Sequence, residues 1–180
     1  MNQRLENAIK EIDLDPIKIR LMKPDRGAEG WAREKVEEVA NLYRRFLYMC
    51  IDDPSSAVVP VDEVDEFWHA HILDTQKYAE DCQKAFGSFL HHFPYFGMRG
   101  SEDRDELQAS FRETSRKYFE LFREDYSVDG QGQPADCSDG SCGAGSCGPR
   151  SFIEHLPERV KNRYLDPSGR PKMAILELEK

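Results

Sequence analysis

Apolar side chains recur at intervals of three and four residues through most of the first 126 residues, and this spacing limits the chain to a helical fold. Residues 1–12, 30–51, 61–86 and 101–126 each carry such a stripe. A stripe with this period covers one face of an α-helix that packs against a core. The sequence therefore predicts a mainly α fold, a small helical-bundle domain in residues 1–126. Its expected core includes Tyr43, Phe46, Leu47, Trp68, Ile72, Phe111 and Leu121.

Proline, glycine and aspartate mark the expected helix ends. Pro16 ends the first helix, because the residue before a proline avoids the helical conformation, and residues 17–30 then form an irregular connection. The stripe in residues 61–86 fits either one long helix or two helices broken at Asp74, a residue suited to an N-cap. Gly87 is a natural stop for this stretch, and the aromatic residues 88–100 are expected to be irregular.

The histidines are concentrated between residues 69 and 92. Four of the five histidines lie within two dozen residues, interleaved with large aromatic side chains: His69, His71, His91 and His92. Histidine is the commonest metal ligand in proteins, and Asp65 lies four residues before His69, on the same face of a helix. We therefore take Asp65 and the four histidines as candidate ligands for zinc or another transition metal.

Helix geometry tests this hypothesis. On a regular helix His69 and His71 point about 200° apart, so they cannot both face one ion. In one continuous helix His69 would lie about 27 Å from Gly87, too far for the next few residues to bring His91 or His92 back. The metal site thus requires a break at Asp74. The competing interpretation is that these histidines are structural and bond to backbone carbonyls.

Composition changes abruptly after residue 126. Residues 127–150 are rich in Gly, Ser, Asp, Pro and Cys and are expected to form a flexible linker, followed by a short C-terminal extension in residues 151–180. Cys137, Cys142 and Cys147 recur every five residues, and thiolates are soft ligands for transition metals. They are a candidate second metal site, with a fourth ligand from His155, Cys82 or a partner. The alternative is a Gly/Ser-rich segment with incidental thiols.

A motif around the first histidine pair resembles a known family. It consists, in order, of Val64-Asp65, Trp68-His69-Ala70-His71, Leu73-Asp74, Tyr78 and Asp81-Cys82, followed by His91-His92. This order resembles the glycine-rich domain-containing protein-like family, in its bacterial members, over roughly residues 30–125. The resemblance implies an all-helical domain and supplies no reaction. Family members often carry proline where this chain has Thr75, which would favour a helix start there.

Charge and hydropathy exclude several classes of protein. The chain has 25 basic and 34 acidic residues and a formal net charge of -9, which argues against general binding to nucleic acid. No apolar run approaches the ~18 residues of a membrane span, and the N-terminus lacks a signal-peptide core. We expect a cytoplasmic protein, with an unidentified protein as the partner if it has one. In that compartment the five cysteines are expected to be thiols or metal ligands.

Three function hypotheses remain. The first is a binding or interaction module that binds metal through the histidine cluster or the cysteine-rich segment. The second is a metal-dependent enzyme that uses Asp65, His69 and His71 as ligands, with a carboxylate as base. The third is a metal storage or delivery protein that works through the cysteines.

Overall fold

The computed structural model describes residues 2–24, 29–53, 56–128, 130 and 132–134. Within these residues the chain forms six helices and, apart from one isolated β-bridge, no strand. The helices are α1 (Gln3–Lys10), α2 (Asp15–Met22), α3 (Arg33–Asp52), α4 (Asp62–Leu73), α5 (Thr75–Phe86) and α6 (Ser101–Phe122). The mainly α fold predicted from the apolar stripes is confirmed.

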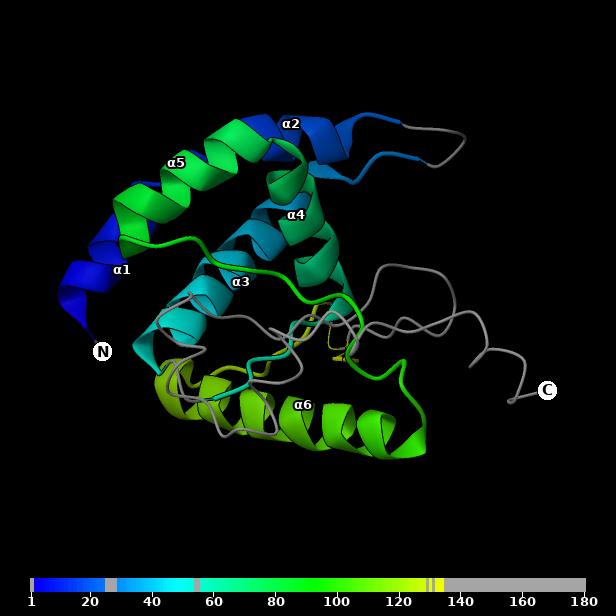
Figure 1. The fold of residues 1–180 in the computed structure, drawn as a ribbon. Coiled ribbons are helices and arrows are strands. Elements are labelled where there is room, and N and C mark those ends of the chain that lie inside the picture. Colours follow the sequence, from blue (N-terminus) through cyan, green and yellow to red (C-terminus); the bar gives the residue numbers. More distant parts are fainter. Residues whose placement is uncertain (1, 25–28, 54–55, 129, 131, 135–180) are drawn as a thin grey trace.

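Helix α3 lies at the centre of the bundle (Figure 1). Helices α1, α2 and α4 pack against α3, and α5 packs against both α1 and α4. Helix α6 lies on the side of α3 away from α2 and α5 (Figure 1). Arg45 of α3 donates to the hydroxyl of Tyr118 in α6 at 2.6 Å, and the backbone N–H of Val59 donates to Thr114 Oγ1 of α6 at 3.0 Å.

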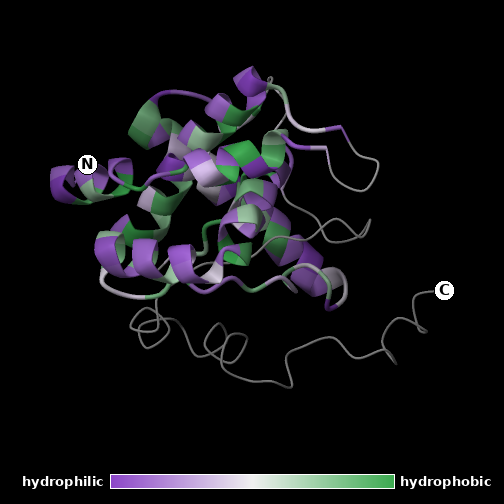
Figure 2. Ribbon diagram, turned by 90° about the horizontal axis from the view of Figure 1, so that it is seen from above, coloured by the Kyte–Doolittle hydropathy of each residue, from purple (hydrophilic) through white to green (hydrophobic). Residues whose placement is uncertain are grey.

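Aromatic side chains dominate the core between these helices. Tyr43, Phe46 and Trp68 are fully buried, and the ring centroids of Phe46 and Trp68 lie 5.2 Å apart. Leu47 and Phe111 are also buried, while Ile72 and Leu121 are partly buried and pack against the core. Hydrophilic and hydrophobic residues are interspersed along the helices (Figure 2), as expected of amphipathic helices whose apolar side chains recur every three or four residues.

The stripe in residues 61–86 is divided between two helices. Helix α4 ends at Leu73, and the side chain of Asp74 caps α5 by accepting a hydrogen bond of 3.3 Å from the backbone N–H of Lys77. Asp74 itself leaves the helical conformation, with φ −85° and ψ 74°. Of the two interpretations that the sequence allowed, the broken helix is the one that the structure contains.

The prediction of an irregular connection over residues 17–30 was wrong for residues 17–22. Residues 15–22 form α2, and Pro16 lies in its first turn. Proline is favoured there, because the first turn of a helix has backbone N–H groups without intrahelical partners and proline has none to offer. The proline therefore starts a second helix where we expected only the end of the first. Ile17 is buried and fixes α2 on the core.

The packed body continues past residue 126, where the linker was expected to begin. Val128 is buried, and Pro134 pairs with Val61 in the isolated antiparallel bridge. The cysteines at 137, 142 and 147 and the extension from 151 to 180 lie outside the described residues. No helix within the described part of the chain is long and apolar enough to cross a membrane.

Candidate metal centre

Helix α4 places Asp65 and His69 on one of its faces, one turn apart. Asp65 lies in the first turn of the helix and is only 1% exposed, although it is an acidic residue. His69 Nε2 lies 3.6 Å from Asp65 Oδ2, which is within ion-pair range but is not a hydrogen bond. The expected pairing of these two side chains is thus present as a contact, and the hydrogen bond of Asp65 goes elsewhere.

His92 reaches the same face of α4 because the chain turns back after α5. Gly87 ends α5 in the left-handed conformation, with φ 72°. The following segment is held against α4 through Tyr78, whose hydroxyl donates to the carbonyl of Leu90 at 2.6 Å and accepts from Trp68 Nε1 at 2.9 Å. The Trp68 and His92 rings then lie with their centroids 4.3 Å apart.

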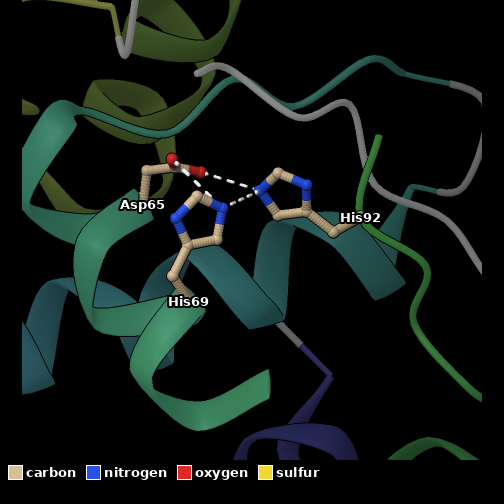
Figure 3. A group of neighbouring side chains, drawn as sticks. All are labelled: Asp65, His69 and His92. Atoms are coloured by element: carbon tan, nitrogen blue, oxygen red, sulfur yellow. Dashed lines mark hydrogen bonds and ion pairs between the residues drawn. The ribbon is translucent and has the colours of Figure 1, made fainter. Parts of the chain in front are cut away.

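Three side chains converge at this point (Figure 3). His92 Nε2 lies 2.9 Å from His69 Nε2 and 3.0 Å from Asp65 Oδ1. One ligand atom from each of Asp65, His69 and His92 lies within 4.8 Å of the other two, and no other three His, Cys, Asp or Glu side chains among the described residues converge in this way. Two nitrogens bound to one zinc ion at ~2.0–2.1 Å can be at most about 4.2 Å apart, so the imidazole spacing is compatible with a shared ion.

Burial sets the protonation of the cluster. It raises the pKa of Asp65 to about 8, a shift that the neighbouring His69 only partly opposes. Burial lowers the pKa of His92 to about 4, and it also lowers the pKa of His69 against the opposing effect of Asp65. Near neutral pH the cluster therefore disfavours imidazolium, and both rings are neutral.

In the absence of an ion, three protons must serve the nitrogens and oxygens of this cluster. Each neutral ring carries one proton, on either Nε2 or Nδ1, and the raised pKa of Asp65 leaves its carboxyl group protonated near neutral pH. Asp65 Oδ2 is buried and has no hydrogen-bond partner among the described residues. A single cation at this point would satisfy both imidazole nitrogens and the carboxylate together.

His71 belongs to a different part of the core. Its Nδ1 lies 3.0 Å from the hydroxyl of Tyr43, and its Nε2 lies 3.1 Å from Asp81 Oδ2, which also pairs with Lys77 at 2.8 Å. A neutral ring with its proton on Nε2 satisfies both contacts, since it donates to Asp81 and accepts from Tyr43. The structure therefore does not assemble the ligand set of Asp65, His69 and His71.

The partners of His71 were missed in the sequence. We expected a structural histidine to bond to backbone carbonyls, whereas its partners are the side chains of Tyr43 and Asp81. One signal could have identified part of this network: Lys77 and Asp81 are four residues apart on α5, a spacing that favours an ion pair.

His91, Cys50 and Cys82 do not belong to the cluster. His91 is exposed, and its ring packs against Phe89 with centroids 4.8 Å apart. Cys50 and Cys82 are buried free thiols, as expected, and burial raises the pKa of Cys82. Trp68 contacts His92, whereas Phe93 and Tyr95 pack on each other.

A surface hollow lies beside His69. Its volume is about 440 Å³, and its walls include Trp31 and the α4 residues Glu66, His69, Ala70 and Leu73. His69 is also the most exposed of the three clustered side chains, at 25% against 8% for His92 and 1% for Asp65. Solvent and small molecules therefore approach the cluster most readily along His69.

A comparison with known protein families identifies the family of this chain. The sequence model of the UCP032817-like family matches residues 5–123, which is more than half of the chain and includes all three clustered residues. No curated protein and no solved structure matches this chain.

Proposed function

The chain belongs to the UCP032817-like family, and we propose that its helical domain is a binding module for a divalent transition-metal ion held by Asp65, His69 and His92. The observation that carries this proposal is the buried Asp65 Oδ2, which has no hydrogen-bond partner among the described residues although two imidazole nitrogens face the same carboxylate. An unsatisfied buried carboxylate oxygen is costly unless an ion or a donor occupies the site.

The ligand types favour zinc. Imidazole nitrogen and carboxylate oxygen are both common zinc ligands, and zinc accepts four ligands in a tetrahedron. Two histidines and one carboxylate also hold non-haem iron in other proteins, so iron(II) is the second metal to test. Calcium and magnesium prefer sites built from oxygen ligands alone, which this cluster is not.

The position of the site supports a binding role. Asp65 and His69 belong to α4, while His92 belongs to the segment after α5, so one ion would join two parts of the chain. The second candidate function is a metal-dependent enzyme, and the hollow beside His69 is the observation in its favour. Catalytic zinc sites keep a coordination position open for water, whereas structural sites are closed by a fourth protein ligand.

Two adjacent histidines provide a matched test of metal binding. The full chain is purified without a histidine tag, and its metal content is measured by mass spectrometry together with its affinity for zinc. We expect stoichiometric metal in the wild type and in His91→Ala, because His91 is exposed and outside the cluster. His92→Ala should lose the metal, because it removes one of three ligands.

Circular dichroism and thermal unfolding show whether both variants are folded, so that a loss of zinc affinity can be assigned to the missing ligand. Equal zinc affinity in His91→Ala and His92→Ala, with both proteins folded, would exclude the proposed site. In that case the cluster would be a buried polar network.

We also propose a relationship to the glycine-rich domain-containing protein-like family. The shared motif supports it, because its residues have connected roles in this fold. Trp68 donates to Tyr78, His69 belongs to the candidate metal centre, and His71 pairs with Asp81. A structure of a member of that family with the same contacts between α4 and α5 would test this relationship.

A further inference from the structure

The hollow beside His69 lies between one face of α4 and the end of α2. Its α4 wall consists of residues spaced by three and four, which share one face of the helix: Glu66, His69, Ala70 and Leu73. The opposite wall includes Arg20, Lys23 and Trp31. Its volume of about 440 Å³ lies within the usual range of small-molecule sites, roughly 300–1,000 Å³. A residue of the candidate metal centre therefore also lines a hollow that is large enough for a small molecule.

Trp31 gives this hollow an apolar wall and is fixed by contacts with α2. Its backbone N–H donates to the carbonyl of Leu21 at 2.9 Å. The neighbouring Gly30 permits this approach, because a Cβ atom at that position would overlap the carbonyl oxygen of Met22. Across the hollow, the side chain of Leu73 is 66% exposed. The two side chains offer apolar surface to a ligand that lies between them.

The candidate metal centre has one ligand fewer than zinc requires, as far as the described residues go. Asp65, His69 and His92 supply three ligands, and zinc takes four. His69 is the most exposed of the three, and it is the one that lines the hollow. A molecule in the hollow is therefore well placed to supply the remaining ligand.

Charge favours a ligand with one negative charge. A divalent ion bound to two neutral imidazoles and to Asp65, once Asp65 has lost its proton, carries one net positive charge. Arg20 and Lys23 contribute two positive charges to the hollow. Glu29 and Glu66 contribute two negative charges, so the charges of its described walls cancel. A monoanion would neutralise the ion, whereas a dianion such as phosphate would leave an excess negative charge close to two carboxylates.

We propose that the candidate metal centre binds a small monocarboxylic acid with an apolar side chain in the hollow beside His69, which rests on the metal-binding function proposed above. The carboxylate displaces water from the remaining coordination position of the ion. It also accepts hydrogen bonds from Arg20, since a guanidinium group can bind a carboxylate through two donors. The apolar side chain packs between Trp31 and Leu73.

Cobalt(II) is the probe for the ion, because its visible absorption changes when one of its ligands changes. The full chain is loaded with cobalt(II) and titrated with phenylacetate, with acetate and with uncharged phenylacetamide. We expect phenylacetate to change the spectrum until the site is saturated. Acetate should bind about tenfold more weakly, because it has no ring to bury. Phenylacetamide should leave the spectrum unchanged.

Four variants test whether the carboxylic acid lies in the hollow. Arg20→Ala should weaken phenylacetate binding about tenfold and leave cobalt affinity unchanged, because it removes a charged donor outside the metal centre. Lys10→Ala, which removes an exposed cation of α1 outside the hollow, is the matched control and should behave as the wild type. Trp31→Ala should abolish the preference for phenylacetate over acetate. Leu73→Ala, at an exposed position, should reduce this preference and covers the case in which Trp31→Ala does not fold.

The contrary outcomes separate this inference from the proposed function. Cobalt binding that needs His92, with a spectrum that no carboxylic acid changes, would overturn the inference and leave the metal centre standing. Equal affinity for phenylacetate in the wild type, Arg20→Ala and Leu73→Ala would show that the acid does not occupy the hollow, which also overturns it. Equal affinity of the wild type for acetate and phenylacetate would exclude the apolar contact. Absence of any cobalt binding that depends on His92 would overturn both proposals.

Discussion

Asp65 and His92 are 27 residues apart in the sequence, yet Asp65 Oδ1 and His92 Nε2 lie 3.0 Å apart in the interior of the bundle. The contact joins the first turn of α4 to the segment that follows α5. It exists because the chain bends at Asp74 and turns back at Gly87. An ion bound by Asp65, His92 and His69 would therefore also hold the segment after α5 against α4.

Metal affinity should rise with pH up to about 8. In the metal-free protein burial raises the pKa of Asp65 to about 8, whereas His92, with a pKa of about 4, is already neutral at pH 7. A metal ion must therefore displace a proton from the cluster below pH 8. The apparent affinity should fall about tenfold for each pH unit below that value and should level off above it.

Calorimetry can count this proton directly. The measurement compares zinc binding in buffers of different ionisation enthalpy at pH 7. We expect release of about one proton per zinc ion. Zinc affinity that stays constant from about pH 6 to pH 8 would contradict the raised pKa of Asp65.

The break between α4 and α5 should accept a proline. Thr75 is the first residue of α5, where proline is favoured, so Thr75→Pro should change the free energy of unfolding by less than about 1 kcal/mol. Asp74→Ala removes the cap on the backbone N–H of Lys77 and should cost about 1 kcal/mol. Ala79→Pro, in the interior of the same helix, is the matched control and should cost about 3 kcal/mol or more.

Urea unfolding of these three variants makes the comparison. A loss in Thr75→Pro as large as that in Ala79→Pro would mean that the two helices are continuous in solution. The candidate metal centre requires the opposite result, since His92 reaches α4 only when the chain bends.

The helices could be predicted from the sequence wherever their apolar stripe was strong. The stripe of α3 from Val36 to Cys50 predicted a helix, and these residues form one. Helix α2 was missed because it is short and because Pro16 is compatible with either the end of one helix or the start of another. Local sequence does not distinguish these cases, and the burial of Ile17 against other helices decides between them.

The candidate site was predictable in part. The spacing of Asp65 and His69 on one helix placed them together, because helical periodicity alone sets that distance. The choice between His91 and His92 was not predictable, since neighbouring residues in an irregular segment point in directions set by the path of the backbone. That path depends on the hydrogen bond from Tyr78 to Leu90, a contact between distant residues.

Trp68→Ala should destabilise the domain by about 3–5 kcal/mol. Trp68 is fully buried, contacts the rings of Phe46 and His92, and donates to Tyr78. Trp68→Phe keeps most of the ring and loses the hydrogen bond, so it should cost less. Denaturant unfolding followed by circular dichroism measures both, and a loss below about 1 kcal/mol for Trp68→Ala would be inconsistent with its burial.

His71→Ala should separate stability from metal binding. His71 is buried between Tyr43 and Asp81, so its removal takes a hydrogen-bond partner from each, at about 1–3 kcal/mol for each buried polar group left unsatisfied. Lys77 still pairs with Asp81, which limits the loss on that side. Zinc affinity should remain that of the wild type, because neither nitrogen of His71 faces the metal centre.

His71→Gln, which keeps a polar side chain of similar reach, covers the case in which His71→Ala does not fold. Urea unfolding and zinc titration on the same preparations give both quantities. Loss of zinc binding with unchanged stability would contradict this prediction, because it would show that His71 is a metal ligand and has no structural role in the core.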